Sequence, residues 1–246
     1  MLHAHPPGST SSERPRAAVT VTELVDRLLP QLLKSAERRQ HALPSEHAIA
    51  RQYGVSRTTV RKAYERLQDM GIITAKQGKG SYLQVKQQKI PLLFNGESSF
   101  TEKMLGLSVH FYTEPLEYGT LENNVDSANG EREKLFKFVR RRWIEGVPAA
   151  LHISYIRLRL FPTIEVDGPK IQSIFAYYRH HGITAFGSLE SNLDIRFPTP
   201  HERFLLSVQP LTPLLEVKTG TTDQTTNQVL EYTQIIYRSD LFTYVL

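Results

Sequence analysis

Apolar residues in the first part of the chain recur at helical intervals. Over residues 22–35 their spacing predicts an amphipathic helix with a wide apolar face. Pro30 lies inside this stretch, and we expect it to kink or split the helix, because proline lacks an amide donor and clashes with the preceding turn. Residues 36–42 are polar and predict a loop.

Two further helices and a hairpin are expected after the first helix. Ser45 can cap one helix that Gly54 ends, and Ser56 can cap another that Gly71 ends. The periodicity then changes to that of two short strands around a turn rich in Lys and Gly, over residues 72–85. The order helix, helix, tight turn, helix, hairpin predicts a winged helix-turn-helix.

The second part of the chain shows no strict alternation of strand-like and helix-like runs, which favours an α+β fold with a mostly antiparallel sheet. The expected strands cover residues 136–144, 149–156, 214–219 and 230–237, and the expected helices cover 101–105, 171–180 and 201–206. The expected organisation is a disordered leader over residues 1–17, a winged helix-turn-helix over 18–86, a linker over 87–96 and one further domain over 97–246.

Composition narrows the classes of function. The chain has no cysteine, which excludes disulfides, thiolate metal sites and cysteine nucleophiles. Residues 1–17 lack the apolar stretch of a signal peptide, and no apolar run approaches the roughly 20 residues needed to span a bilayer. We therefore expect a cytoplasmic protein with no membrane partner.

Charge is unevenly distributed along the 246 residues. Residues 18–86 carry 12 Lys or Arg against 6 Asp or Glu, whereas residues 87–246 carry 16 against 18. This division is typical of a chain in which one domain binds a polyanion. A solvated basic surface is the alternative interpretation of the same counts.

The expected third helix has a polar face whose first turn and a half contains Arg57, Thr58 and Arg61. Recognition helices place this end in the major groove, where arginine binds guanine or phosphate and threonine binds phosphate or the thymine methyl group. Any one of these residues would also suit an ordinary solvated helix face. The set of residues, followed by a basic hairpin, favours DNA recognition.

The turn of the hairpin carries Gly78, Lys79 and Gly80. Glycines allow a hairpin tip to enter a narrow minor groove, and lysine can bind the phosphates that line it. A plain hairpin turn explains the glycines equally well but explains the lysine less well.

Three motifs stand out in this region: Leu43-Pro44-Ser45-Glu46, Tyr53-Gly54-Val55-Ser56-Arg57-Thr58-Thr59-Val60-Arg61 and Gln77-Gly78-Lys79-Gly80. Over residues 18–85 they closely resemble the N-terminal domain of GntR-type regulators. One departure is His47, which stands where the family usually has an arginine that touches phosphate. The resemblance implies that double-stranded operator DNA is bound by Ser45, His47, Arg57, Thr58, Thr59, Arg61, Gly78, Lys79 and Gly80.

Further motifs lie in the second part of the chain: Ser99-Phe100-Thr101-Glu102, the run from Arg140 to Pro148, Ser173 at the start of a helix, Glu231-Tyr232 and Tyr237-Arg238-Ser239-Asp240. Over residues 97–243 they resemble the UTRA effector domain of the HutC-like branch of GntR regulators. The resemblance implies a chorismate-lyase-like fold without lyase activity, a small-molecule effector and a homodimer.

Arg140 and Arg142 lie two residues apart on an expected strand, so their side chains should share one face of the sheet, and Arg141 should lie on the other. Two neighbouring guanidiniums repel each other unless an anion or carboxylates lie between them. An anionic ligand and pairing with internal Asp or Glu are both open interpretations.

The family often has a carboxylate where this chain has His152, and in relatives that bind amino-sugar phosphates this carboxylate helps to hold the sugar. The substitution weakens that assignment and allows a different ligand, including one with a carboxylate. The expected effector contacts are Ser99, Phe100, Thr101, Arg140, Arg142, His152, Ser173, Glu231 and Tyr237.

The function predicted from the sequence is therefore a DNA-binding regulator, expected to be a repressor controlled by a small anionic metabolite such as a sugar phosphate. No catalytic motif, metal site or cofactor is expected. An enzyme fused to a DNA-binding domain and an architectural DNA-binding protein without an effector are the alternatives. The size and the lack of excess basic charge of the second domain favour the regulator over the architectural protein.

Overall fold

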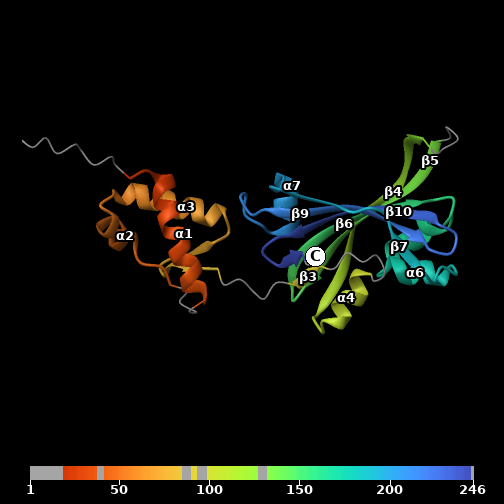
Figure 1. Cartoon of the computed structure of the whole chain (residues 1–246), viewed down its shortest axis with the longest axis horizontal. Coiled ribbons are helices and arrows are strands. Elements are labelled where there is room, and N and C mark those ends of the chain that lie inside the picture. Colours follow the sequence, from red (N-terminus) through yellow and green to blue (C-terminus); the bar gives the residue numbers. More distant parts are fainter. Residues whose placement is uncertain (1–18, 38–41, 85–89, 93–98, 127–131, 245–246) are drawn as a thin grey trace, which may run out of the picture. The chain divides into compact units, whose positions relative to one another are not determined.

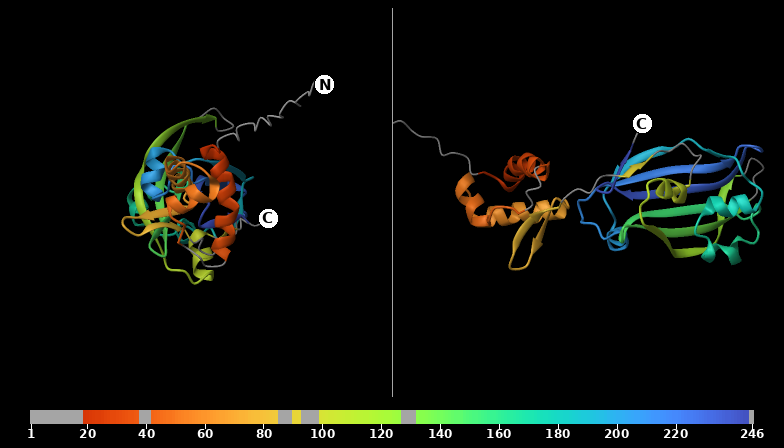
Figure 2. Two further views of the ribbon diagram at one scale, coloured as in Figure 1. Left: turned by 90° about the vertical axis from the view of Figure 1, so that its left-hand side faces the viewer. Right: turned by 90° about the horizontal axis from the view of Figure 1, so that it is seen from below.

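The computed structural model describes residues 19–37, 42–84, 90–92, 99–126 and 132–244. The chain divides into two compact units. Figures 1 and 2 show both units from three directions. The N-terminal unit covers Met1–Leu67 and Ile73–Leu83, and the C-terminal unit covers Gln68–Ile72 and Gln84–Leu246.

The N-terminal unit is a winged helix-turn-helix. Its core is formed by apolar side chains from every helix and both hairpin strands, among them Leu24, Ile49, Leu67, Ile73 and Leu83. This order of elements confirms the fold predicted from the sequence. The elements are α1 (Val21–Glu37), α2 (Glu46–Tyr53), α3 (Arg57–Asp69), β1 (Ile73–Lys76) and β2 (Gly80–Leu83).

Pro30 does not split the first helix. It lies inside α1, which also includes residues 36 and 37 of the predicted loop. Leu28 and Leu32, on either side of the proline, are both buried. Burial of this apolar face supports one continuous helix despite the amide donor that proline lacks.

The C-terminal unit is built on a seven-stranded sheet in which all described strand pairs are antiparallel. The strand order is β4-β5-β6-β10-β9-β7, and β8 also pairs with β9. This architecture confirms the predicted α+β class. The strands of the sheet are β4 (Phe111–Asp126), β5 (Arg132–Ile144), β6 (Val147–Arg157), β7 (Phe186–Ser188), β8 (Asn192–Arg196), β9 (Leu214–Asp223) and β10 (Gln228–Arg238).

Short helices and one small sheet complete this unit. The helices are α4 (Phe100–Gly106), α5 (Ile164–Asp167), the 3₁₀ helix η1 (Gly168–Lys170), α6 (Ile174–His180) and α7 (Pro200–Leu206). Strands β3 (Ile90–Leu92) and β11 (Phe242–Tyr244) pair in parallel. Residues 90–92 of the expected linker over 87–96 therefore form a strand, whose backbone partners come from the other end of the chain.

The two faces of the large sheet are covered by different helices. Phe100 and Met104 of α4 pack with Ile235 and other side chains on one face, and α6 packs on this same face. Leu206 of α7 packs with Leu151 on the opposite face. Figure 1 shows α4 and α6 on one side of the sheet and α7 on the other.

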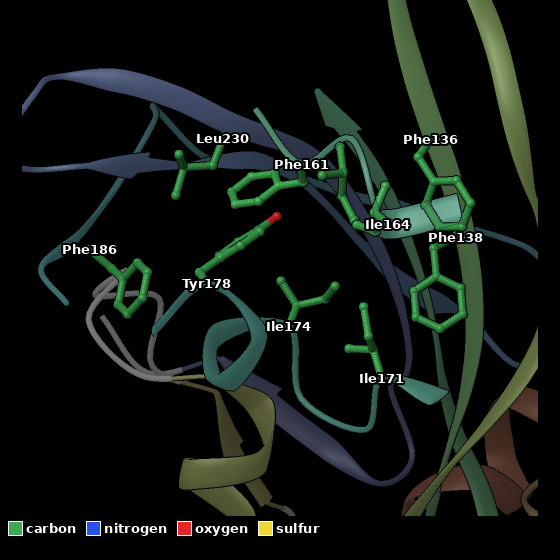
Figure 3. Packing of buried hydrophobic residues seen from close by; sticks show 10 residues of the cluster. Phe136, Phe138, Phe161, Ile164, Ile171, Ile174, Tyr178, Phe186 and Leu230 are labelled. Carbon is green, nitrogen blue, oxygen red and sulfur yellow. The ribbon is translucent and has the colours of Figure 1, made fainter. Parts of the chain in front are cut away.

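A cluster of aromatic and aliphatic side chains holds α6 against the sheet. Tyr178 lies at its centre, with its ring 4.8 Å from that of Phe161 and its side chain fully buried. Figure 3 shows Tyr178 among Phe161, Ile174 and Leu230, with Phe136 on the adjoining strand. The cluster therefore fixes the position of α6 on the sheet.

Candidate functional site

The structure presents the N-terminal half of α3 to solvent. Arg57, Thr58 and Arg61 are exposed, whereas Val60 is fully buried on the opposite side of the helix. The charged face is thus the one that the core leaves free, as a recognition helix requires.

The buried face of α3 is anchored by Tyr64. Its hydroxyl donates a hydrogen bond of 2.8 Å to the carbonyl oxygen of Pro44, at the turn before α2. Burial raises the pKa of Tyr64 to about 12, so that the hydroxyl keeps its proton and remains a donor. This bond fixes α3 relative to the start of α2.

Three hydroxyls near the expected DNA surface form helix caps or local bonds. Ser45 Oγ accepts a hydrogen bond of 3.2 Å from the backbone N–H of Ala48, as the sequence predicted for an N-cap. Ser56 Oγ accepts one of 3.0 Å from the N–H of Thr59 and lies 2.8 Å from Thr59 Oγ1. Thr59 is half-buried, while Ser45 and His47 are exposed. The hydroxyls of Ser45 and Thr59 are therefore already engaged within the unit.

The hairpin turn exposes its glycines and lysines. Gly78 and Gly80 have φ values of 72° and 93°, which a residue with a Cβ atom adopts at a cost. The hydroxyl of Tyr82 donates a hydrogen bond of 2.9 Å to the carbonyl oxygen of Lys79, and Lys76 Nζ lies 5.1 Å from the centre of the Tyr82 ring. Tyr82 therefore supports the shape of the exposed turn.

In the C-terminal unit, Arg140 and Arg142 lie on the sheet face that α4 and α6 cover. Arg140 on β5 lies opposite His152 on β6, and His152 lies opposite Ile235 on β10. Residues directly opposite each other on neighbouring strands have their side chains on the same face of the sheet. Arg141 lies on the other face, where it pairs with Glu114 at 2.8 Å. The prediction that Arg140 and Arg142 share one face is confirmed.

Both of these arginines are buried, with relative exposures of 0% and 2%. Arg140 Nη2 donates a hydrogen bond of 2.5 Å to Ser154 Oγ. Arg142 Nη1 donates to Thr113 Oγ1 and, at 3.4 Å, to the carbonyl oxygen of Gln172. Their guanidiniums also lie 4.7 Å and 5.0 Å from aromatic ring centres, those of Phe138 and Phe100 respectively.

Several polar atoms in this cluster have no hydrogen-bond partner among the described residues. They are Nε and Nη1 of Arg140, Nε of Arg142 and both ring nitrogens of His152. A buried polar atom without a partner costs about 1–3 kcal/mol, and more when it is charged. Such a concentration of unpaired atoms in one place indicates a site for a polar ligand or for water.

Electrostatics in the cluster favour an additional negative charge. Burial lowers the pKa of Arg140 to about 10, although Glu231 acts in the opposite direction. Burial, followed by the charge of Arg140, also holds the pKa of Arg142 well below its ordinary value. Burial raises the pKa of Glu231, which Arg140 opposes. Two buried cations thus share one nearby buried carboxylate.

His152 is uncharged in this environment. Burial, and then the charges of Arg140 and Arg142, hold its pKa well below 6.5. Its ring can therefore donate one hydrogen bond and accept another. It adds recognition capacity without adding charge.

A cavity of about 90 Å³ opens beside this cluster. Five of the expected effector residues line it, namely Ser99, Phe100, His152, Glu231 and Tyr237. The cavity is also lined by residues that the sequence motifs did not predict, namely Lys103, Phe175, Ser188, Thr221 and Thr233. Thr221 Oγ1 donates a hydrogen bond of 3.1 Å to Glu231 Oε1, which orients this carboxylate.

The remaining expected effector residues are placed differently. Arg140 and Arg142 are buried around the cavity without forming its wall, and Thr101 does not line it. Ser173 Oγ accepts a hydrogen bond of 3.4 Å from the N–H of Ala176 as the N-cap of α6, and it lines a separate open hollow. Ser99 both lines the cavity and caps α4 with its hydroxyl.

The described residues also bear on membrane insertion and on metal binding. Among the helices described, none combines the length and the apolar character needed to cross a membrane. In that part of the chain no three His, Asp or Glu side chains are grouped so that they could hold a metal ion.

Comparison with known proteins agrees with this architecture. Residues 20–83 match the model of bacterial regulatory proteins of the gntR family, and residues 128–243 match the UTRA domain. Among curated proteins, the HTH-type transcriptional repressor NagR of Bacillus subtilis is 25% identical, covering 91% of this chain and 92% of the relative. The mannosyl-D-glycerate transport/metabolism system repressor MngR of Escherichia coli is 24% identical, covering 91% and 93%.

A solved structure supports the fold. The crystal structure of PhnF from Mycobacterium smegmatis superposes with a TM-score of 0.57 and 21% identity, covering 90% of this chain and 97% of that one. At this level of identity the likeness shows the fold alone.

Proposed function

Since the chain is a GntR-type transcriptional regulator with a UTRA domain, we propose that it is a cytoplasmic repressor whose affinity for operator DNA falls when a small anionic metabolite binds beside Arg140 and Arg142. The observation that supports this most strongly is the buried cluster itself. It has two guanidiniums, one carboxylate, a neutral imidazole and several unpaired polar atoms next to a cavity.

Charge sets the class of ligand. With His152 neutral, one negative charge on the ligand balances the excess of Arg140 and Arg142 over Glu231. Lys103 at the cavity wall favours a second negative charge, as in a phosphate monoester. The carboxylate of Glu231 lines the cavity, which suits a hydroxyl or amine on the same ligand.

The names of relatives agree with a metabolite of this kind. One relative is the repressor of a mannosyl-D-glycerate system, and another is a probable repressor of a fructoselysine utilization operon. Glycerate and lysine each carry a carboxylate, and both compounds carry sugar hydroxyls. A polyhydroxylated anion is therefore the class that we propose for this chain.

On the DNA side, α3 lies in the major groove in this proposal. Arg57, Thr58 and Arg61 contact bases or phosphates there, and the turn with Lys79 follows the backbone. Two copies of the chain bind the two halves of a palindromic operator as a homodimer, because one winged helix covers only one half-site.

The ligand part of the proposal is tested by binding to the full chain. Thermal-shift screening of sugar phosphates, sugar acids and inorganic phosphate, followed by calorimetric titration, should give saturable binding of an anion. Arg142→Gln should abolish this binding, and Arg141→Gln, a change on the same strand but on the other face, should leave it intact. Equal binding by both variants would place the ligand elsewhere.

A further inference from the structure

The turn of the β1–β2 hairpin, between residues 76 and 80, is held by bonds to the backbone of one lysine. The N–H of Lys79 donates a hydrogen bond of 2.9 Å to the carbonyl oxygen of Lys76. The carbonyl oxygen of Lys79 accepts one of 2.9 Å from the hydroxyl of Tyr82. Both backbone polar groups of Lys79 are therefore engaged, while the residue itself is exposed. Its ammonium group extends from a fixed point on the backbone.

Tyr82 is well anchored in the N-terminal unit. It lies on β2 opposite Thr74 of β1, and on its other side it pairs with Ala42. Next to it, the N–H of Leu43 donates a hydrogen bond of 2.9 Å to the carbonyl oxygen of Ser81. Tyr82 therefore lies on the middle one of three paired segments, and its hydroxyl reaches from there to the turn.

The ring of Tyr82 also holds a second lysine. Lys76 lies opposite Gly80, two residues before Tyr82 on β2, so that Lys76 and Tyr82 share one face of the hairpin. The Nζ atom of Lys76 lies 5.1 Å from the centre of the Tyr82 ring, within the range of a cation–π contact. One aromatic side chain thus positions two positive charges, one through the backbone of Lys79 and the other through the side chain of Lys76.

Tyr82 is placed to act through these lysines rather than by binding DNA itself. A tyrosine hydroxyl has one proton to donate, and that of Tyr82 is donated to Lys79. The oxygens of a DNA phosphate are acceptors, so they need such a proton. The groups that remain available to DNA are the two ammonium groups.

A fixed, positively charged turn suits one kind of DNA. The minor groove of A·T-rich tracts is narrow, and its enhanced negative potential attracts inserted cationic side chains. Gly78 and Gly80 carry no side chains that would keep the turn out of such a groove. A turn that already has its bound shape loses less conformational entropy on binding than a mobile turn does.

We propose that Tyr82 is the positioning residue through which the hairpin turn favours A·T-rich DNA beside the sequence that α3 recognises. This inference rests on the proposed DNA binding, and it adds a sequence preference and the residue that sets it. The two components are separable, because α3 reads base edges in the major groove and the turn reads the width of the minor groove.

Tyr82→Phe tests the proposal because it removes only the hydroxyl. The ring remains beside Lys76, and water can reach the carbonyl oxygen of the exposed Lys79, so thermal unfolding should match that of wild type. The full chain is used to select binding sites from random-sequence DNA. Both proteins should select the same central motif, with A·T-rich flanks enriched by wild type and much less by Tyr82→Phe.

Affinities measured on the selected motif give the size of the effect. With A·T-rich flanks, Tyr82→Phe should bind about 2- to 10-fold more weakly than wild type, as the loss of one hydrogen bond implies. With G·C-rich flanks the two proteins should bind equally. In a Lys79→Ala background Tyr82→Phe should cause little further loss, because residues that act through one contact are not additive.

Tyr53→Phe is the matched control, because it removes a tyrosine hydroxyl from α2 in the same unit. That hydroxyl accepts a hydrogen bond of 2.8 Å from Gln31 Nε2 on α1. The control should keep the affinity and the flank preference of wild type.

The proposal is overturned if Tyr82→Phe keeps the flank preference of wild type, or if its loss of affinity is the same with and without Lys79. A wild type that selects a central motif without A·T-rich flanks would overturn this inference alone and leave the proposed regulator intact. A wild type that selects no motif would overturn the proposed DNA binding together with it.

Discussion

Arg57 and Arg61 in the N-terminal unit are exposed on a helix, whereas Arg140 and Arg142 in the C-terminal unit are buried on a strand. Exposed cations suit a long polyanion, which gains affinity by releasing counterions from many phosphates. Buried cations suit a small anion, because in a site of low dielectric one added charge has a large effect. The same side chain therefore serves two kinds of recognition, according to whether the core covers it.

The largest expected effect is on the buried side of this comparison. Glu231→Leu removes the carboxylate near Arg140 and Arg142, and we expect it to destabilise the C-terminal unit by about 3–5 kcal/mol, since two buried cations are left without it. Urea denaturation measures this change. The matched control is Glu117→Leu on the same sheet, where the carboxylate is exposed and pairs with Lys137.

The control should change stability by no more than about 0.5 kcal/mol. If Glu231→Leu is equally mild, the carboxylate is not needed to balance the arginines. The buried cluster would then be less strained than its unpaired atoms indicate.

On the exposed side, Arg57→Ala and Arg61→Ala should weaken DNA binding without affecting folding. Each should cost about 1–3 kcal/mol of binding free energy if it contacts a base. Arg61 first has to leave a weak ion pair with Glu65 at 3.7 Å, where both side chains are more than half exposed. Fluorescence anisotropy with DNA from upstream of the chain's own gene measures the change.

Arg66→Ala, in the last turn of α3, is the matched control and should have a smaller effect. Should all three variants bind as wild type does, α3 is not the recognition helix.

A smaller effect is expected from pH. The folded protein holds the pKa of His152 well below 6.5, so the unfolded chain binds a proton more readily at mildly acidic pH. The stability that depends on neutral His152 is present above pH 6.5 and is lost as pH falls from there towards the folded pKa. Unfolding measured from pH 7.5 to pH 5 should show this loss in wild type and a shallower slope in His152→Leu. Parallel slopes for the two proteins would contradict the buried, neutral histidine.

Local sequence features predicted much of the fold because their causes are local. The caps at Ser45 and Ser56 and the faces of α3 follow from spacing along one helix, and the shared face of Arg140 and Arg142 follows from the period of a strand. Strand β4 escaped prediction because Pro115 and Gly119 interrupt an irregular mixture of polar and apolar residues. The pairing of β3 with β11 joins residues about 150 positions apart, which no local pattern indicates.

The residues that line the cavity were only partly predictable, because local patterns do not show which distant segments come together. His152, Glu231 and Tyr237 lie on adjacent strands, and the resemblance to UTRA domains identified them. Lys103 and Thr221 reach the cavity from a helix and a strand whose packing depends on the whole unit. Thr101 and Ser173, two of the expected effector residues, do not line this cavity, and Ser173 lines a separate hollow beside α6.

The central claim is that the buried arginines control DNA binding through a ligand. The most direct measurement is the affinity of the full chain for its upstream DNA, with and without the anion found by screening, in wild type, Arg142→Gln and Arg141→Gln. We expect the anion to weaken DNA binding by about 5–150-fold in wild type and in Arg141→Gln, as a coupling of about 1–3 kcal/mol implies. Arg142→Gln should bind DNA as wild type does and fail to respond. A normal response in Arg142→Gln would contradict the account.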